Sequence, residues 1–466
     1  METNIKLYFV NLLLLIILVF TNLIVLNHND FLYYGSIVSS GELYKDIYFS
    51  YPPGSFIFNK VISFFFPNNY DYVVMRFSST FLFLISINIL ANSFLKKEES
   101  KIYFLFLTSL LCSFGAFEIG SYSLSFFLFV MSLVKFFFGK NNRDFFLAGL
   151  YFGLCLSTRP TYVPCAIYFL LLILKNKNCK QNLLSSIIGG LLGILPYLFY
   201  FIKDFNSLMF FNYKLHLLHN ESYRWKGLLS FIKNLLVRIS IDYIITVPLL
   251  FTYFYYLFKN IYKRLFEFIL LFTLSFSSIV VFVAHKQYFE PLFIIIFLFM
   301  FINLNLNNAN RFIISLIIVA SVGKFLITYK NLDKSKYTFK NINSIFSVLN
   351  SKKEIELIID RNLRKECNLI YRTTSPVFLP YGLIHHPFNI QGVWLFRLKE
   401  NLTIKLNKYI DYNNYINFYK KDFNVIIVGY YALNEYELKL IEYAKKENWK
   451  LFYTTNFKIF VKNECT

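Results

Sequence analysis

The stretch that decides the fold is HNDFLYYGSIVSSGELYKDIYFSYPPGS, residues 28–55, which directly follows the first long apolar segment. It is rich in Asp, Tyr, Gly and Pro, and Asp30, Glu42 and Asp46 place three acids beside a hydrophobic wall. An ionised acid next to a bilayer is costly, so it is usually paired or functional. We therefore predict that this stretch forms the floor of an active site at the outer surface of a membrane.

The composition indicates a polytopic α-helical membrane protein. The chain has 466 residues, of which 56% are hydrophobic and 21% aromatic, and several apolar runs reach the length needed to cross a bilayer. The formal net charge is +21, but the basic residues lie mostly in short loops and in the C-terminal tail. Such residues anchor and orient a chain against anionic lipid, so we predict membrane lipids and no nucleic acid as partners.

Residues 1–329 form the predicted transmembrane domain, which includes residues 28–55 as an acidic first outer loop. The segment FIFNKVISFFF, residues 56–66, is too short to cross a bilayer and is predicted to lie at the interface. Eleven spanning helices are expected at about 6–26, 72–95, 102–117, 122–138, 145–156, 162–174, 183–202, 241–258, 265–284, 288–304 and 312–329.

Loop charges predict the orientation of these helices. If successive helices alternate in direction, the cationic loops KKEESK, GKNNRD, KNKNCK, KNIYKR and NNANR all lie on one face. Short cationic loops mark the cytoplasm, so the N-terminus is predicted inside and the tail outside. The expected location is the inner membrane of a bacterium.

The tail, residues 330–466, is far more polar and is predicted to be a small extracytoplasmic α/β domain. NVIIVGYY, WKLFYTT, FKIFVKN and LIYRTTS have the pattern of strands, and NEYELKLIEYAKKEN that of an amphipathic helix. The six cysteines include no CxxC pair, which argues against a zinc or thiol-redox site. Cys367 and Cys465 share one compartment in this topology and can pair.

Three acids are candidates for chemistry at the outer face. Asp30 and Asp46 could deprotonate an acceptor hydroxyl or hold a divalent cation, or they could simply sit in a solvated loop. Glu118 ends the third predicted helix on the same face, as a second acid over the site or as a solvated helix end. The need for a metal is left open.

Basic and polar residues on the same face are candidates for phosphate binding. Arg159, in the segment STRP, lies between two short apolar segments that suggest a kinked region lining a cavity. Its planar donor fork suits a phosphate oxygen, although it could instead extend to lipid headgroups. Lys286, Gln287 and Tyr288 could bind a phosphate and a sugar hydroxyl, or Tyr288 could be an interface residue. Arg224 belongs to a basic loop that contacts lipid phosphate or solvent.

These motifs resemble those of polytopic GT-C glycosyltransferases, the group that includes ArnT-like and protein mannosyltransferase-like (glycosyltransferase family 39-like) enzymes. Asp30-Phe31-Leu32-Tyr33-Tyr34 looks like the acidic motif of the first outer loop. Gly41-Glu42-Leu43-Tyr44-Lys45-Asp46 and Tyr51-Pro52-Pro53-Gly54 look like the remainder of that loop in the family, and His285-Lys286-Gln287-Tyr288-Phe289 looks like a helix-end segment of several members.

The resemblance implies a polyprenyl-phosphate-linked sugar donor and inverting transfer to a glycan, lipid or protein of the cell envelope. By it, Asp30 is the general base; Asp46 is predicted to be a second catalytic carboxylate. Tyr33 and Tyr44 bind substrate, and Arg159 and Lys286 neutralise the leaving lipid phosphate. The alternatives are a flippase or transporter of lipid-linked oligosaccharide and an O-antigen-type polymerase.

Overall fold

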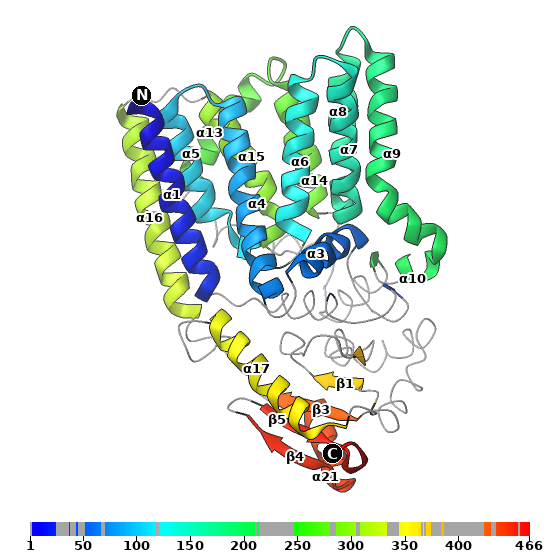
Figure 1. The fold of residues 1–466 in the computed structure, drawn as a ribbon. Coiled ribbons are helices and arrows are strands. Elements are labelled where there is room, and N and C mark those ends of the chain that lie inside the picture. The colour runs from blue at the N-terminus through cyan, green and yellow to red at the C-terminus, as the bar shows by residue number, and fades with distance from the viewer. Residues whose placement is uncertain are drawn as a thin grey trace.

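The computed structural model shows a helical bundle with a smaller α/β domain beyond one end (Figure 1). The structure describes residues 2–24, 37, 43–44, 52–66, 70–117, 119, 121–209, 212–213, 247–279, 286–303, 308–332, 344–364, 367, 370–373, 384–385, 424–429, 435–454 and 457–466.

The bundle consists of long helices that each overlap one of the predicted apolar segments. Within the described residues they are α1 (Glu2–Ile24), α4 (Tyr70–Phe94), α5 (Glu98–Leu111), α6 (Ser121–Phe138), α7 (Asn142–Thr158), α8 (Cys165–Leu174), α9 (Cys179–Lys203), α13 (Val247–Lys259), α14 (Leu265–Ile279), α15 (Lys286–Asn303) and α16 (Asn308–Leu332). Four of them, α1, α4, α6 and α9, are long and apolar enough to cross a membrane by length and composition. The predicted α-helical polytopic fold is therefore confirmed.

Several of these helices differ from the prediction by a few residues at their ends, and two of the differences involve short 3-10 helices. The third predicted helix stops at Leu111 and continues as the short 3-10 helix η1 (Phe114–Phe117), whose Ala116 carbonyl accepts a hydrogen bond from Thr80 Oγ1 at 3.0 Å. The sixth begins only at Cys165, because Pro160 starts the 3-10 helix η2 (Pro160–Tyr162), Pro164 follows it, and proline lacks the N–H that a helix interior needs.

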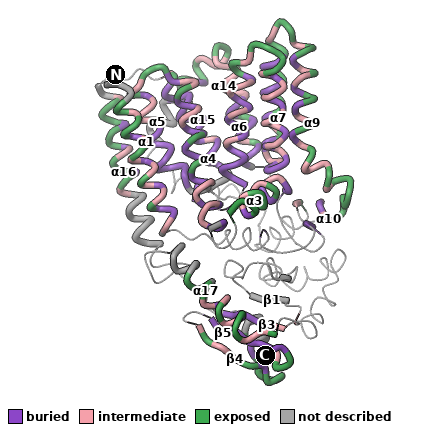
Figure 2. Tube along the Cα trace, viewed as in Figure 1, coloured by how far each residue is buried: buried purple, intermediate pink, exposed green. Residues whose placement is uncertain are grey.

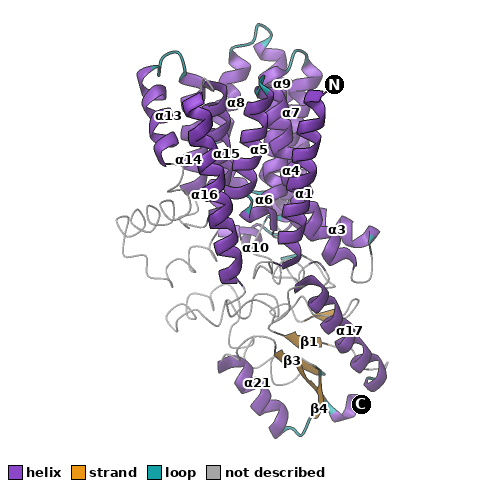
Figure 3. Ribbon diagram, turned by 90° about the vertical axis from the view of Figure 1, so that its left-hand side faces the viewer, coloured by secondary structure: helices purple, strands orange, loops and turns teal. Residues whose placement is uncertain are grey.

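The two ends of the bundle are distinct. The N-terminus lies at one end, and α16 leaves the other end toward α17 (Ser344–Asn362), as an odd number of crossings requires (Figure 1). Helix α3 (Pro53–Phe65) lies across the end nearer to α17 and contacts α4, α6, α7 and α9 (Figures 1 and 3). It coincides with the predicted interfacial helix. Its Phe56 is buried, whereas Phe64 is 80% exposed.

Burial follows the bundle as the hydrophobic pattern predicts. Buried residues face the centre of the bundle, and exposed residues cover the outer faces of α1, α9 and α16 (Figure 2). The exposed side chains of α9 include Leu184, Leu191 and Phe199. Large apolar side chains that stay exposed along a whole helix are expected where the surrounding solvent is lipid rather than water.

Helices α7 and α9 pack with their backbones in contact. A Cβ atom built at Gly149, Gly153, Gly189 or Gly193 would lie 2.0–2.3 Å from a backbone carbonyl oxygen of the facing helix. Only glycine permits this separation, which is the close approach that small residues give to helices in membranes. The packing holds the C-terminal end of α7 in place, where α7 contacts α3.

The tail forms the predicted α/β unit. Its five-stranded sheet has the order β2-β1-β3-β5-β4, with bounds β1 (Ile370–Thr373), β2 (Ile384–His385), β3 (Val425–Gly429), β4 (Lys450–Tyr453) and β5 (Phe457–Val461). Strand β1 pairs in parallel with β2 and β3, and β5 pairs antiparallel with β3 and β4. Helix α21 (Glu435–Lys446) follows β3. Cys367 and Cys465 form a disulfide, which joins the region after α17 to the C-terminus.

Three short elements complete the described chain. These are α10 (Phe205–Met209), directly after α9, and the 3-10 helix η6 (Asn463–Cys465), together with strand β2. Helix α17 and strand β2 were not predicted from the sequence. The first is mostly polar, with several charged residues, and the second has only two residues, so neither carries a clear periodic signal.

Candidate active site

The structure describes only some of the predicted site residues. Outside the described residues lie Asp30, Tyr33, Asp46, Glu118 and Arg224. For Lys286, Gln287 and Tyr288 the structure describes only the backbone, which forms the first turn of α15. The roles of all eight stay predictions, and the site is built from Arg159, Tyr44 and the residues around them.

Arg159 is a buried cation at the junction of α7 and η2. Its backbone is extended (φ −156°, ψ 94°), as Pro160 requires of the preceding residue, and its N–H donates to the Cys155 carbonyl at 2.7 Å. The side chain is only 6% exposed. Burial inside the bundle argues against the alternative that Arg159 extends to lipid headgroups.

Aromatic rings surround the Arg159 guanidinium. Its central carbon lies 4.4 Å from the centroid of the Tyr122 ring and 5.9 Å from that of Tyr162. The faces of aromatic rings attract cations, so these rings compensate part of the lost hydration. The guanidinium is thus held in a defined place while its donor fork remains suited to an anion.

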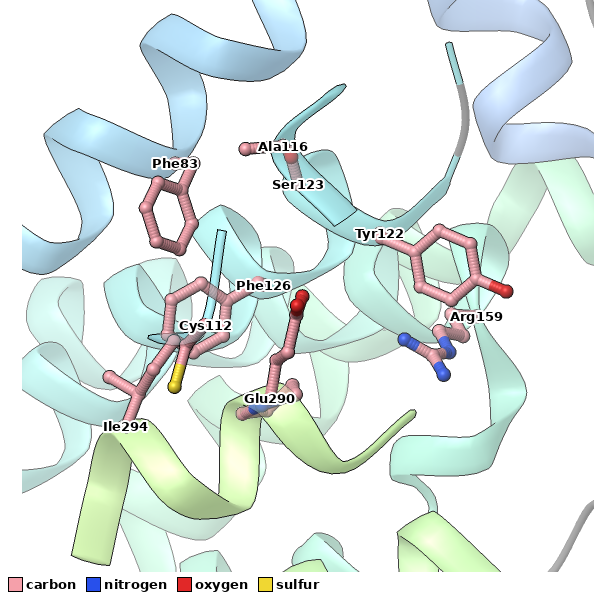
Figure 4. A pocket seen from close by; sticks show the side chains of 10 residues that line it. Phe83, Cys112, Ala116, Tyr122, Ser123, Phe126, Arg159, Glu290 and Ile294 are labelled. Carbon is pink, nitrogen blue, oxygen red and sulfur yellow. The ribbon is translucent and has the colours of Figure 1, made fainter. Parts of the chain in front are cut away.

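A cavity beside Arg159 also contains a buried acid. Arg159, Tyr122, Ser123 and Glu290 are its polar lining residues, and its apolar lining consists of Phe83, Cys112, Ala116, Phe126, Pro291 and Ile294. Glu290 is 5% exposed. Its carboxylate extends from α15 into the same space that the Arg159 guanidinium approaches from the end of α7 (Figure 4). The cavity is therefore lined by one buried cation and one buried acid.

A second cavity lies against Arg159 and is lined by hydroxyl groups. Its lining consists of Arg159, Thr161, Tyr162, Leu274, Ser277, Ser278 and Pro291. Ser277 and Ser278 donate hydrogen bonds to the carbonyls of Thr273 and Leu274 within α14 at 2.8 and 2.9 Å. Ser277 Oγ also lies 3.6 Å from Cys165 Sγ. Arg159 and Pro291 line both cavities.

A second buried arginine lies where α1 meets α4. Arg76 is fully buried, and its Nε donates to Asn22 Oδ1 at 2.7 Å while Nη2 donates to the Asn22 carbonyl at 3.0 Å. Asn22 Nδ2 donates in turn to Thr80 Oγ1 at 2.6 Å. Thr80 bonds to η1, which lines the Arg159 cavity. This network fixes the end of α1, only a few residues before Asp30 in the sequence.

Helix α3 is joined to α4 by a polar cluster. Asp71 is fully buried, and its carboxylate accepts hydrogen bonds from the Tyr72 backbone N–H at 2.8 Å and from Ser63 Oγ at 3.5 Å. Lys60 donates to the carbonyl of Ile37. Partial burial lowers the pKa of Lys60, and the charge of Asp71 opposes this effect. The cluster places the Lys60 cation beside Ile37, which belongs to the segment 28–55.

Tyr44 is buried against the end of α9. Its phenol oxygen accepts a hydrogen bond from Asn212 Nδ2 at 3.3 Å, and its ring meets the Tyr200 ring edge-on at 5.4 Å between centroids. Burial raises the pKa of Tyr44, which keeps the phenol neutral. Its φ of 69° lies in the left-handed region that a bulky residue adopts only when its surroundings hold it there.

Sequence reasoning missed Asp71, Arg76 and Glu290. Each is a charged residue within or at the start of a predicted apolar helix, and such a residue is a candidate functional group by its position alone. Glu290 also directly precedes Pro291. Among the described residues, no group of three or more His, Cys, Asp or Glu side chains is arranged to hold a metal ion.

Comparison with solved structures shows that the fold resembles that of ArnT. The chain is similar to ArnT from Cupriavidus metallidurans in the apo state, with a TM-score of 0.58, 11% sequence identity and 98% of both chains covered. It is similar also to the same protein bound to undecaprenyl phosphate, with a TM-score of 0.55, 11% identity and the same coverage. No family model and no curated protein sequence matches the chain. At this identity the likeness shows the fold, an integral membrane fold, and assigns no residue a role.

Proposed function

We propose that this protein is a membrane glycosyltransferase that transfers a hexose or pentose from a polyprenyl-phosphate-linked donor to a glycan, lipid or protein of the cell envelope. The observation that carries the proposal is the buried Arg159 guanidinium beside a cavity of the GT-C fold. The similar ArnT structure holds undecaprenyl phosphate. A polyprenyl phosphate combines a membrane-embedded tail with an anionic group that an arginine binds.

The proposed reaction is a single displacement at the anomeric carbon. The acceptor hydroxyl transfers its proton to the Asp30 carboxylate as its oxygen forms the new glycosidic bond. The bond between the anomeric carbon and the phosphate oxygen breaks, and the electron pair leaves with the lipid phosphate. Arg159 and Lys286 stabilise the charge that develops on that phosphate. Attack from the face opposite the leaving group inverts the anomeric configuration.

Two observations support an extracytoplasmic site. The Cys367–Cys465 disulfide lies in the tail, and structural disulfides persist in oxidising compartments. The short cationic loops follow the ends of α4, α6, α8 and α13, whereas α3 and the start of α17 lie at the opposite end of the bundle (Figure 1). Cationic loops favour the cytoplasm. We therefore place the tail and the Arg159 cavity on the outer side, in a bacterial inner membrane.

The positions of the buried charges favour an enzyme over a flippase. Asp71 and Arg76 lie in the first two turns of α4, Glu290 lies near the start of α15, and Arg159 ends α7. A transporter of a charged lipid headgroup is expected to place such groups along its path through the membrane. These four are the buried charged residues of the described chain, and they lie toward one end of the bundle.

The proposal is tested with purified protein, a set of radiolabelled undecaprenyl-phosphate-linked hexoses and pentoses, and an envelope extract as acceptor. Asp30→Asn keeps the size of the side chain but removes the base, so transfer is expected to fall by about 10²–10⁴-fold. The matched control is Asp204→Asn, an exposed residue after α9 whose carboxylate accepts from the Ser207 N–H at 3.0 Å. Asparagine caps a helix as well as aspartate does, so this variant should stay active. Wild-type transfer by Asp30→Asn would remove Asp30 from the mechanism, and an inactive wild type with every donor would contradict the proposed activity.

A further inference from the structure

Arg76 is a buried cation of α4 that binds another helix. Its side chain is fully buried, and burying a guanidinium is costly unless hydrogen-bond acceptors compensate for the lost water. Its Nε donates to Asn22 Oδ1 at 2.7 Å, and its Nη2 donates to the Asn22 carbonyl at 3.0 Å. Its Nη1 donates to the Tyr72 hydroxyl at 3.4 Å. An apolar residue of similar size could pack here without the cost of burying a charge, so the two bonds to α1 point to a role beyond packing.

The bonds from Arg76 stabilise the last turn of α1. Asn22 lies in that turn, and α1 has no basic residue of its own there. The carbonyls in the last turn of a helix carry partial negative charge, so a cation beside them is favourable. Arg76 supplies the cation from α4 and binds Asn22 at two points. Asn22 Nδ2 in turn donates to the Arg76 carbonyl at 3.0 Å, so the contact between the two helices is reciprocal.

The same network reaches the wall of the Arg159 cavity. Asn22 Nδ2 also donates to Thr80 Oγ1 at 2.6 Å, and Thr80 Oγ1 donates to the Ala116 carbonyl at 3.0 Å. Ala116 of η1 and Phe83 of α4 line the cavity that Arg159 lines from the end of α7 (Figure 4). A continuous chain of buried hydrogen bonds therefore joins the end of α1 to the wall of that cavity.

We propose that Arg76 is a positioning residue, which holds the end of α1 against the Arg159 cavity and so sets the place of Asp30 relative to the lipid phosphate. This inference rests on the proposed function. Asp30 follows Asn22 by eight residues in the sequence, so a shift at the end of α1 moves the start of the segment that carries the base. The base and the anomeric carbon must meet the acceptor hydroxyl together, and a misplacement of about 1 Å can reduce the rate by about 10²-fold.

The inference predicts a loss of rate without a loss of lipid binding. Arg76→Lys keeps the charge but cannot bind Asn22 through a planar fork. In lipid nanodiscs its kcat for sugar transfer should fall by at least about tenfold. Its affinity for bare undecaprenyl phosphate should stay within about twofold of the wild type, because Arg159 is unchanged. An equal loss of affinity and kcat would indicate that Arg76 itself binds the phosphate and would overturn the positioning role.

The matched control is Arg264→Lys, the same exchange at the opposite end of the bundle. Arg264 pairs there with Glu267. This variant should keep the kcat and the lipid affinity of the wild type. The unfolding temperature is measured for both variants, because a merely structural role of Arg76 would lower the unfolding temperature and the lipid affinity together with kcat. That pattern in Arg76→Lys would also overturn the inference.

A second variant tests whether Arg76 acts through Asn22. Asn22→Leu keeps the size of the side chain but removes the acceptor for Arg76 Nε and the donor to Thr80. Its kcat should fall by a similar factor, and the double variant with Arg76→Lys should be no slower than the slower single variant, because both changes break one contact. Effects that multiply in the double variant would overturn the proposed route. If either variant does not fold, Thr80→Val breaks the same network by removing one hydroxyl, and its kcat should fall several-fold at unchanged lipid affinity; a wild-type kcat would overturn the inference.

Comparison with Asp30→Asn separates this inference from the proposed function. If Asp30→Asn is inactive and folded Arg76→Lys transfers sugar at the wild-type rate, the positioning role alone is overturned. A wild type that transfers no sugar from any donor would overturn the proposed function as well.

Discussion

Replacement of Gly153 by alanine tests whether the contact of α7 with α9 holds the Arg159 site. An ideal Cβ at Gly153 would lie 2.2 Å from the carbonyl oxygen of Gly190 and 3.0 Å from Cα of Gly193. Carbon and oxygen atoms in favourable contact are about 3.3–3.6 Å apart, so the two helices must separate locally by roughly 1 Å. Both contacts are with backbone, which cannot rotate away as a side chain can.

The expected cost combines two opposing terms. Overpacking of a close contact costs about 1–3 kcal/mol, whereas replacing a helical glycine by alanine returns about 0.5–1 kcal/mol of conformational entropy. We therefore expect a net destabilisation of about 0.5–2 kcal/mol. Arg159 lies six residues after Gly153, so the same shift displaces the guanidinium. A misplacement of about 1 Å can reduce the rate by about 10²-fold.

The assay is thermal unfolding of the purified protein in detergent, combined with sugar transfer from the lipid-linked donor. The control is Gly190→Ala, because the nearest atom to a Cβ at Gly190 is the Gly149 carbonyl oxygen at 3.7 Å, an ordinary contact. Gly190→Ala should unfold at or above the wild-type temperature and stay active. If Gly153→Ala unfolds no lower than Gly190→Ala and transfers sugar at the wild-type rate, the packing argument is refuted.

Two further substitutions test the site and the tail. Arg159→Lys keeps the charge but loses the planar donor fork and its stacking on the tyrosine ring. Sugar transfer should therefore fall by at least about tenfold, with little change in unfolding temperature. Transfer at the wild-type rate would show that charge alone suffices. Cys465→Ser opens a bridge to Cys367 across 98 residues of sequence, and a loop of that length contributes up to about 4.7 kcal/mol in the chain-entropy model. Limited proteolysis should therefore cut the tail of this variant faster than the tail of the oxidised wild type. The reduced wild type should be cut as fast as the variant. Equal rates in the variant and the oxidised wild type would contradict the prediction.

Most of the fold could be predicted from the sequence because the relevant signals are local. A continuous apolar run indicates a spanning helix without any knowledge of its neighbours, and loop charge predicts its orientation. The strands at 425–429 and 457–461 likewise follow from short runs of apolar and β-branched residues. The predicted ends of the third and sixth helices were less accurate. The observed ends, at Leu111 and Cys165, lie next to a tertiary hydrogen bond and next to two prolines.

The candidate site could likewise be predicted only in part. The sequence by itself determined a helical membrane protein with a polar tail and an arginine at the end of a short apolar segment, and it predicted an acidic outer loop and an interfacial helix. Only the tertiary structure decided that Arg159 is buried against Tyr122, that Glu290 shares its cavity and that Arg76 binds Asn22 across two helices. Composition and periodicity show whether a segment is stable in lipid, in water or in a protein core. A site depends instead on which side chains from distant segments meet, and the packing of the helices decides that.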